Sequence, residues 1–490
     1  MAARQLGSDR GWRALDGRQR RVLGSTLTAN ALVFFDQTAV VVALPFIGRE
    51  FGADAAKLQW VMTAYLLALA VFMLVGGRVA DRIGLRRTFF AGLATFTVGS
   101  LLCAVAPSLP VLIAARFLQG LGGAIVQPLA LAITTRAVSE SQRGWAIGAL
   151  ATGGTSFLVF GPLIGGVLLL ADWRWIFLAS LPVAATSVAL GHNAIHGSKE
   201  AEPQPVPWAS IPPLLAGLTL VVFGLVSGAE LGVLSLVPGV AGLGVLALFV
   251  FHESRVKNPL IDVRLLSNSM LTTSLVALFA IQFAVFGVTV YLALYLHHRL
   301  GLGGVAAGAV IAVAGLGTPL LSQRAGRLAD RFGPRHLVLP GLFFASVGLV
   351  LLAVLAPLGG VLILLPGLAV FAASRPAVFT PAGTGPFLAL SAQQRAFAAS
   401  LATEARQLGA VFGVAVTTAI GIAVHGTSMV DSGPPGHGLR ATTMVAAAVC
   451  ALAAATAWRW MPRGARVGSG SGAQGEGPAM RQQCGPADQR

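Results

Sequence analysis

One stretch of the chain, residues 77–87, reads Gly77-Arg78-Val79-Ala80-Asp81-Arg82-Ile83-Gly84-Leu85-Arg86-Arg87. It returns 249 positions later, at residues 326–336, as Gly326-Arg327-Leu328-Ala329-Asp330-Arg331-Phe332-Gly333-Pro334-Arg335-His336, with seven of the eleven positions identical. Each copy lies between two long apolar segments and is too short to be a domain, and its glycines permit a tight turn. A duplicated turn indicates that the surrounding structural unit is itself duplicated.

The composition is that of an integral membrane protein. Of the 490 residues 55% are hydrophobic and 11% charged, and the mean hydropathy is +0.78, whereas roughly 25% of the residues of a soluble domain are charged. The net charge of +16 does not indicate nucleic-acid binding, because the arginines are scattered through short connections between apolar segments. We interpret the basic excess as a topology signal, since Lys and Arg accumulate on the cytoplasmic side of a membrane.

Apolar segments of about 20 residues, the length that crosses the hydrocarbon core, recur about fourteen times. They are expected near residues 22–48, 57–80, 88–106, 110–136, 144–170, 173–191, 209–227, 232–252, 270–296, 303–323, 335–356, 359–385, 397–424 and 440–461. The predicted fold is therefore an all-α integral membrane protein with two six-helix bundles and two extra transmembrane helices between them.

The domain boundaries follow from these segments. We expect a cytoplasmic N-terminal segment (1–21), an N-terminal bundle (22–191), a linker with the two extra helices (192–268), a C-terminal bundle (269–461) and a disordered cytoplasmic tail (462–490). With both termini inside, the cytoplasmic connections hold about 24 Lys and Arg and the outer ones about five, the asymmetry that membrane insertion favours.

Asp36 is the only acidic residue deep in the first apolar segment. An ionised carboxylate there costs about 2.5–3.5 kcal/mol on the insertion scale, and such residues are functional by default. Asp36 is therefore a candidate proton carrier, and the alternative is an Asp that only hydrogen-bonds to neighbouring helices.

The fourth segment places Arg116, Gly120, Gly123 and Gln127 at spacings of four, three and four, so they share one helix face. The glycines let another helix approach, and the permanently charged Arg116 needs a carboxylate, carbonyl or water as partner. We identify Asp36 as a candidate partner, so that protonation and conformation could be coupled. A fixed structural ion pair is the alternative.

The fifth segment carries small residues and one proline in a recurring pattern. Gly154, Gly161 and Gly165 fall on one face, and Pro162 removes a backbone hydrogen bond and allows a kink. Together with Gly166 they are expected to form a smooth sealing surface.

The repeated turn is a candidate conformational latch. Asp81 and Asp330 each end a helix, where a carboxylate opposes the helix dipole unless an Arg or another helix N-terminus compensates it. The alternative is that the turn only anchors two helices to the lipid headgroups. The residues of the proposed latch are Gly77, Asp81, Arg82, Gly84, Arg86, Arg87, Gly326, Asp330, Arg331, Gly333 and Arg335.

These stretches resemble the signature motifs of the major facilitator superfamily, specifically of its 14-span drug:proton antiporter branch. Residues 77–87 resemble the motif after the second helix, residues 116–124 the fourth-helix motif linked with proton transfer, and residues 161–166 the antiporter motif. Further motifs of the branch are matched by Asp36-x-Thr38 through Ala43-Leu44-Pro45, Trp60-x-x-Thr63-x-Tyr65-Leu66, Trp173-Arg174-Trp175-Ile176-Phe177, Asn258-Pro259-Leu260, and Arg406-Gln407-x-Gly409 with Gly413.

Several polar and aromatic residues are candidates for substrate or ion-pair contacts. Glu404 lies two positions from Arg406 and so does not face it, which leaves Arg375 as its candidate partner. Aromatic residues of the ninth segment would suit flat apolar or cationic molecules if they face a cavity, and lipid or neighbouring helices are the alternative. The full set is Gln119, Gln127, Gln282, Tyr291, Tyr295, Arg375, Glu404 and Arg406.

The resemblance implies proton-coupled efflux of small hydrophobic or amphipathic drugs or antibiotics across the cytoplasmic membrane by alternating access. Two other transport functions stay open, a dedicated exporter of one endogenous natural product and a proton-coupled uptake symporter. No nucleophile and base pair, metal cluster or phosphate loop is evident, so we expect no enzyme activity, no cofactor and no metal. The expected partners are protons, a small-molecule substrate and the lipid bilayer, with the chain as a monomer.

Overall fold

The computed structural model describes residues 11–196, 206–256, 259–261, 263–384, 392–425 and 436–462, and within these ranges every regular element is a helix. Fourteen spans of the described chain are long and apolar enough to cross a membrane. The all-α fold predicted from hydropathy is thereby confirmed, and the chain is a multi-pass membrane protein. The tail expected to be disordered lies outside the described residues from 463 onward.

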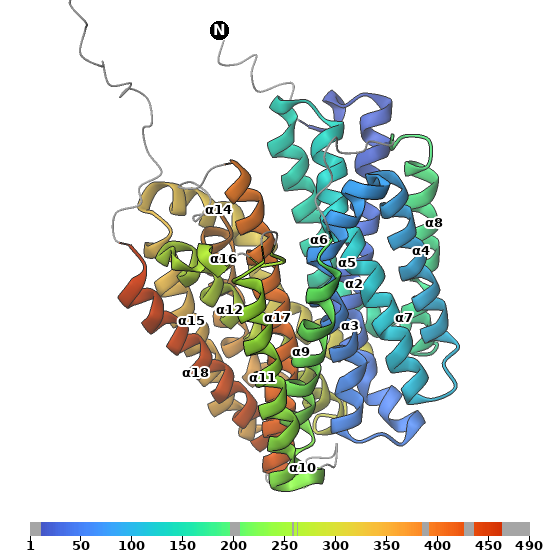
Figure 1. The fold of residues 1–490 in the computed structure, drawn as a ribbon. Helices are drawn as coiled ribbons and strands as arrows, with labels where there is room; N and C mark the ends of the chain where they lie inside the picture. Colours follow the sequence, from blue (N-terminus) through green and yellow to red (C-terminus); the bar gives the residue numbers. More distant parts are fainter. Residues whose placement is uncertain are drawn as a thin grey trace, which may run out of the picture.

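The helices form two bundles with a helical linker between them (Figure 1). The first bundle contains α2 (Gly17–Phe51), α3 (Ala55–Ile83), α4 (Leu85–Ala104), α5 (Leu109–Ala137), α6 (Glu140–Leu168), α7 (Arg174–Leu178) and α8 (Ser180–Gly191). The second bundle contains α12 (Ser269–His298), α13 (Gly304–Gly315), α14 (Gly317–Phe332), α15 (Arg335–Leu355), α16 (Val361–Thr384), α17 (Ala392–His425) and α18 (His437–Trp460).

The linker consists of α9 (Ile211–Val226), the short α10 (Gly228–Leu231) and α11 (Leu236–Glu253). Helices α9 and α11 pack against each other, and α9 also packs against α3 of the first bundle and α17 of the second. The two extra helices therefore lie against the junction of the bundles, and the predicted order of six, two and six spans is confirmed.

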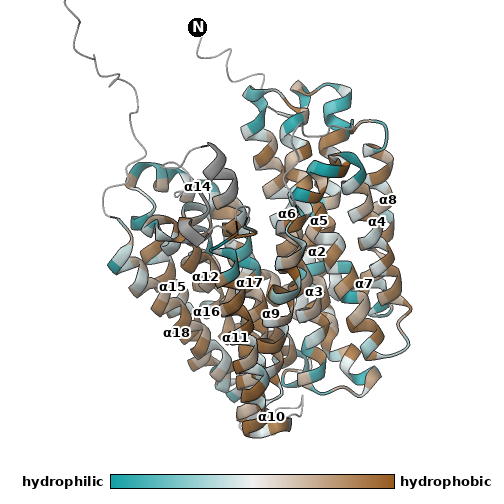
Figure 2. Cartoon of the chain, in the orientation of Figure 1, coloured by the Kyte–Doolittle hydropathy of each residue, from teal (hydrophilic) through white to brown (hydrophobic). Residues whose placement is uncertain are grey.

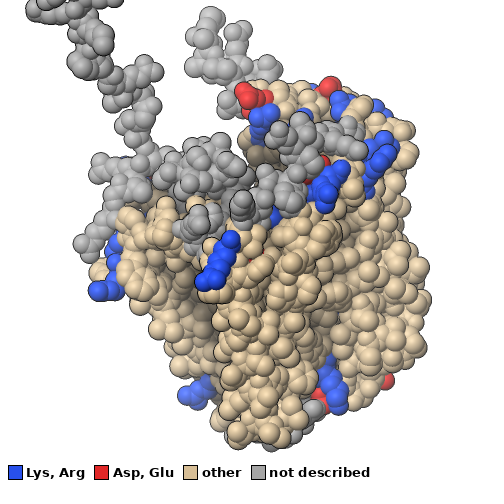
Figure 3. All heavy atoms as spheres, in the orientation of Figure 1, with Lys and Arg blue, Asp and Glu red and all other residues tan. Residues whose placement is uncertain are grey.

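The surface has the polarity that a bilayer requires. Apolar residues dominate the middle of the helices and hydrophilic residues gather at their ends (Figure 2). On the face drawn in Figure 3, Lys and Arg cluster at the end that carries the N-terminus, with fewer at the opposite end and a broad uncharged band between. We call the end where α2 begins the N side and the other end the far side.

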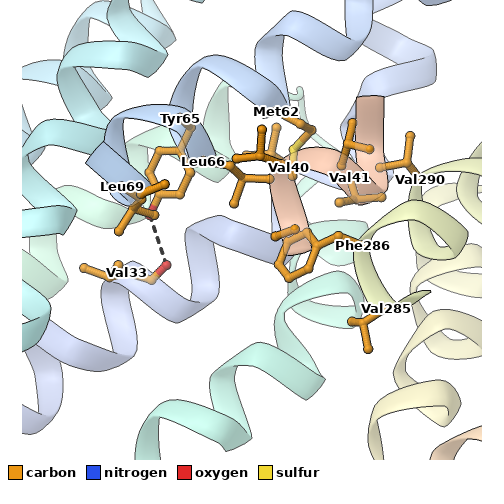
Figure 4. Close-up of a cluster of buried hydrophobic side chains, with 14 of the residues drawn as sticks. Val33, Val40, Val41, Met62, Tyr65, Leu66, Leu69, Val285, Phe286 and Val290 are labelled. Carbon is orange, nitrogen blue, oxygen red and sulfur yellow. Dashed lines mark hydrogen bonds between the residues drawn. The ribbon is translucent and has the colours of Figure 1, made fainter. Parts of the chain in front are cut away.

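The bundles meet on the far side and separate toward the N side (Figure 1). Near the far end of the contact, the ring of Phe46 on α2 lies 4.8 Å from that of His297 on α12. Deeper in the molecule, Val41 and Met62 of the first bundle face Phe286 and Val290 of α12 in one apolar cluster (Figure 4). This packing joins the bundles through apolar side chains rather than charges.

Two predicted spans are broken helices. The span predicted at 173–191 divides into α7 and α8 at Ala179, and the span predicted at 303–323 divides into α13 and α14 at Leu316. In each case a proline, Pro182 or Pro319, follows the break by three residues. A proline has no N–H for the carbonyl four positions earlier, and its ring crowds that carbonyl, so the helix is interrupted there.

The repeated turn adopts the same backbone geometry in both bundles. Gly84 between α3 and α4 has φ 97° and ψ 140°, and Gly333 between α14 and α15 has φ 87° and ψ 154°. Each glycine donates its amide N–H to the carbonyl four residues earlier, on Ala80 or Ala329, at 2.8 Å. These φ values are disfavoured for residues with a Cβ, so the glycines are required for the turn.

We predict that Gly84→Ala and Gly333→Ala each lower the unfolding temperature of the protein in detergent, because a positive φ costs a non-glycine residue about 1–3 kcal/mol. Gly77→Ala is the matched control, since Gly77 has no neighbouring atom within 4 Å of an added Cβ and no positive φ. The control should unfold at or above the wild-type temperature. Equal stability of all three variants would show that the two turns tolerate a side chain.

Candidate functional site

A buried ion pair joins α2 and α5 inside the first bundle. Arg116 Nη1 lies 2.5 Å from Asp36 Oδ2, and both side chains are fully buried. The second carboxylate oxygen of Asp36 accepts a hydrogen bond from Gln119 Nε2 at 3.0 Å. Both oxygens of this intramembrane carboxylate therefore have a donor, and the structure brings together the two residues that the sequence offered as candidate partners.

Arg116 is held by further groups from neighbouring helices. Its Nε donates to the carbonyl of Val61 on α3 at 3.0 Å, and its guanidinium lies 4.2 Å from the ring centre of Tyr65. Nη1 also donates to Gln119 Oε1 at 2.6 Å, while Nη2 has no hydrogen-bond partner among the residues that the structure describes. Gln119 in turn donates to Ser100 Oγ on α4 at 2.8 Å. The pair thus sits in a network that spans α2, α3, α4 and α5.

Glycines of α5 let the neighbouring helices come this close. A Cβ at Gly120 would overlap the carbonyl of Tyr65 on α3, and one at Gly122 would overlap the backbone of Phe96 on α4. A Cβ at Gly123 would lie 3.2 Å from the side chain of Val33 on α2. Gln127, placed on the same face from the sequence, is half-buried and lies outside the network.

The glycines of α6 contact α2. An added Cβ would meet the Phe34 ring at Gly154, the Thr38 hydroxyl at Gly161 and the Ala39 carbonyl at Gly165. The Thr38 hydroxyl also donates to the carbonyl of Leu158 on α6 at 3.0 Å. The three glycines therefore face α2 within the same bundle.

A different face of α6 closes the interface between the bundles. A Cβ at Gly166 would overlap the carbonyl of Gly304 on α13, and a Cβ at Gly308 would overlap the carbonyl of Pro162. Backbones of the two bundles thus touch near the far side of the membrane. The residues expected to seal the transporter divide into an internal set, Gly154, Gly161 and Gly165, and an interface set, Pro162 and Gly166.

Equivalent arginines of the two turns bind equivalent helix ends. Arg86 Nη2 donates to the carbonyl of His192, just after α8, at 2.7 Å. Arg335 donates to the carbonyls of Trp458, at 2.7 Å, and Met461 at the end of α18. Each arginine ties the turn to the last helix of its own bundle, where the carbonyl end of the helix dipole favours a cation.

The other turn residues are closer to solvent. Asp81 and Gly77 are half-buried, and the remaining charged side chains of the proposed latch are exposed: Arg82, Arg87, Asp330 and Arg331.

Glu253 at the end of α11 is a buried acid that the sequence did not single out. Its Oε1 accepts from Ser210 Oγ at 2.5 Å, and its Oε2 accepts from the amides of Leu260 and Ile261. It thereby fixes the Pro-Leu part of the Asn258-Pro259-Leu260 motif, whose Asn258 lies outside the described residues. Arg78 of the first turn donates to the carbonyl of Pro259 at 2.6 Å, so the linker is fastened to α3.

Among the described residues, Arg375 and Glu404 do not form the ion pair that was considered between them. Arg375 is buried, and its Nη1 donates to the carbonyl of Ala314 at 2.8 Å, next to the break between α13 and α14. Glu404 is buried on α17, its Oε2 has no hydrogen-bond partner, and no ion pair of Glu404 occurs within the described chain. Arg406 is half-buried.

The tyrosines of α12 have structural contacts. Tyr295 is buried and donates its hydroxyl to the carbonyl of Ala356 at 2.7 Å, and the Tyr291 hydroxyl occupies the space beside Gly421 of α17. Gln282, on the same helix, is buried. The placement of both tyrosines against neighbouring helices favours packing over substrate contact.

Related proteins agree with this architecture. A family model described as Major Facilitator Superfamily matches residues 26–414 and, in a second match, 275–483. The "Multidrug resistance protein B homolog" of Mycobacterium tuberculosis is 34% identical over 341 residues, which cover 68% of this chain and 63% of that protein. The "Puromycin resistance protein pur8" of Streptomyces alboniger is 32% identical over 458 residues, covering 88% of this chain and 89% of that protein.

Solved structures show the same fold at low sequence identity. An inward-facing bacterial homolog of the human lysosomal transporter Spinster matches with a TM-score of 0.66 at 17% identity, covering 91% of this chain and 97% of that one. A D-xylose-proton symporter matches with a TM-score of 0.64 at 14% identity, covering 90% and 97%. With a duplicated helix bundle, a buried charge network and a family model that matches most of its length, the chain belongs to the Major Facilitator Superfamily.

Proposed function

We propose that the chain is a proton-coupled exporter of small hydrophobic or amphipathic molecules, which works by alternating access across the cytoplasmic membrane. The family and the transporter relatives indicate a membrane transporter of small molecules. Relatives whose names include multidrug resistance and puromycin resistance support export as the direction of transport. The observation that carries the coupling is the ion pair between Asp36 and Arg116, fully buried within the first bundle.

Protonation of Asp36 would weaken the ion pair that joins α2 to α5. A proton on Oδ2 removes the charge that faces Arg116 Nη1 at 2.5 Å, while Arg116, permanently charged, keeps the Val61 carbonyl and Gln119 Oε1 as acceptors. The contact between α2 and α5 then weakens without leaving the arginine unbound. A proton that enters the cell contributes about 2.3 kcal/mol per 100 mV of membrane potential, which can drive the export step.

The conformation described is closed on the far side, where the backbones of α6 and α13 touch at Gly166 and Gly308. With both termini in the cytoplasm, as the surplus of Lys and Arg at the N side supports (Figure 3), the bundles separate toward the cytoplasm. The two repeated turns end α3 and α14 on this open side. A latch there would act in the opposite conformation, when the N side closes. We further propose that the chain works as a monomer.

We predict that Asp36→Asn abolishes export driven by a pH gradient in proteoliposomes, because the amide cannot carry the coupled proton. Downhill exchange of the same substrate, for which puromycin is the first probe, should persist because it needs no net proton movement. Undiminished gradient-driven export by the variant would exclude Asp36 as the proton carrier.

A second variant separates this effect from misfolding. Asp36→Asn leaves Arg116 buried without its countercharge, and breaking such a pair destabilises a protein by about 3–5 kcal/mol. The double variant Asp36→Asn with Arg116→Gln removes both charges, so its thermal unfolding in detergent should recover toward wild type while gradient-driven export stays absent. A double variant that regained export would contradict the assignment.

We predict that Gly166→Ala and Gly308→Ala shift the population away from the conformation closed on the far side. Each added methyl would overlap a carbonyl of the other bundle, and overpacking typically costs about 1–3 kcal/mol. Spin labels at the exposed Leu170 and Leu358 should report longer distances. Gly148→Ala on α6, where no atom lies within 4 Å of the new Cβ, is the control. Distance distributions identical to this control would contradict a closing role for the interface.

A further inference from the structure

A cavity at the N side of the first bundle belongs neither to the buried ion pair nor to the interface between the bundles. Its volume is about 220 Å³, and it lies between the beginnings of α2 and α4, the end of α5 and the segment that follows α8. The residues that line it are Arg18, Val22, Leu85, Ile133, Arg136, Ala137, Ala194, Ile195 and His196. The cavity is therefore at the end of the molecule where Lys and Arg cluster (Figure 3).

The lining divides into a basic rim and an apolar floor. Arg18, Arg136 and His196 are exposed and form the rim, whereas the apolar residues are buried or half-buried and form the floor. Val22 lies one helical turn deeper than Arg18 on α2, and Ile133 lies about one turn deeper than Arg136 on α5. The rim thus lies at the hydrophilic helix ends and the floor extends toward the apolar band (Figure 2). This is the polarity of the boundary between lipid headgroups and acyl chains.

The segment that follows α8 is held in place by arginines of two other helices. Arg18 donates from Nε to the carbonyl of Ala194 at 3.0 Å, and Arg86 donates from Nη2 to the carbonyl of His192 at 2.7 Å. The bond of Arg18 does not use its two Nη groups. The His196 ring contacts the Ala194 carbonyl through Nδ1 at 3.2 Å. The basic rim is therefore built into the wall of the cavity.

The charge of the rim is complementary to an anion. Among the described residues, no acid lines the cavity. The acids nearest to the rim along the chain have other partners, since Asp16 accepts from the amide of Gln19 at 2.7 Å and Glu140 pairs with Arg143 at 3.4 Å. A phosphate suits an arginine rim, because the planar guanidinium offers two parallel N–H groups to two phosphate oxygens.

The apolar floor and the volume identify the kind of anion. A soluble phosphate has no apolar part to cover the floor, whereas a phospholipid carries its phosphate beside glycerol and acyl carbons. At about 220 Å³, the cavity is smaller than the roughly 300–1,000 Å³ of pockets that enclose a whole drug-sized ligand. It therefore suits the headgroup of a molecule whose remainder lies in the bilayer. Basic pockets between transmembrane helices are sites of this kind.

We propose that this cavity binds the phosphate of an anionic phospholipid from the leaflet on the N side. Arg18 and Arg136 donate to the phosphate oxygens, and the apolar floor contacts the glycerol and acyl carbons. The bound headgroup joins the beginning of α2, which carries Asp36, to the end of α5, which carries Arg116, and so stabilises the first bundle. A soluble phosphate offers the same oxygens, and the experiment separates the two sources.

Native mass spectrometry of the full-length protein in detergent tests the site by measuring how tightly individual lipids are retained. The probes are dioleoylphosphatidylglycerol and dioleoylphosphatidylcholine, which has the same acyl chains and no net charge, with glycerophosphate as the soluble source. We expect one phosphatidylglycerol to bind about tenfold or more tightly than phosphatidylcholine, since each basic residue near an anionic lipid contributes roughly fivefold. Phosphatidylglycerol should also raise the thermal unfolding temperature, and glycerophosphate should not.

Substitutions then assign the preference to this cavity. Arg18→Gln combined with Arg136→Gln should reduce the affinity for phosphatidylglycerol to that for phosphatidylcholine. Ala137→Leu fills the cavity and leaves the charge unchanged, so it should also weaken the binding of phosphatidylglycerol, an effect that attraction to a basic surface alone would not produce. Arg459→Gln, at an exposed position in the last turn of α18, is the control and should bind like wild type.

Four results would overturn the lipid site. They are equal retention of the two lipids by the wild type, equal stabilisation by glycerophosphate, a double variant that keeps the preference, and an Ala137→Leu variant that binds phosphatidylglycerol like wild type. If the double variant does not fold in detergent, the wild type and Ala137→Leu still decide. Because no transport is measured, these results are independent of whether Asp36 couples export to protons.

Discussion

The ion pair between Asp36 and Arg116 determines how the first bundle is built. Moving either charge into the membrane interior costs several kcal/mol even after relaxation, so each must find compensation within the protein. The carboxylate accepts hydrogen bonds from Arg116 and Gln119 of α5, and the guanidinium also contacts the Val61 carbonyl and the Tyr65 ring of α3. Satisfying one pair of charges therefore fixes the relative positions of three helices, and Gln119 extends the arrangement to α4 through Ser100.

The helix backbones must also approach one another closely, because the buried charges need partners on neighbouring helices. Apolar side chains do not drive membrane helices together, because lipid tails are equally apolar, so contact depends on small residues and polar bonds. Gly120 lets α5 approach α3 closely enough for Arg116 to reach a backbone carbonyl. Glycines of α6 allow two such close contacts. Gly161 and Gly165 pack against α2, and Gly166 packs against α13 of the other bundle. Helix α6 therefore contacts both the other bundle and the helix that carries Asp36.

The fold could be predicted from the sequence for two reasons. The apolar segments indicate the transmembrane helices, and the repeated turn indicates that the helix bundle is duplicated. The breaks at Ala179 and Leu316 were not predicted, although Pro182 and Pro319 indicated them, since a hydropathy window does not register a missing N–H. In the candidate site, Asp36 and Arg116 were identifiable as intramembrane charges. The Val61 carbonyl could not be identified as a partner of Arg116, because every residue has a backbone carbonyl and the residue type does not show which one accepts a hydrogen bond.

The considered pairing of Arg375 with Glu404 shows the same limit. The spacing of residues along one helix can exclude ion-pair partners on that helix. It does not indicate which neighbouring helix supplies the partner. The structure gives Arg375 a backbone carbonyl, that of Ala314, beside the break that precedes Pro319. The broken helix thus provides the acceptor that Arg375 uses. The two bundles share a fold and a turn, but within the described residues a countercharge is found for the buried carboxylate of Asp36 in the first bundle and not for that of Glu404 in the second.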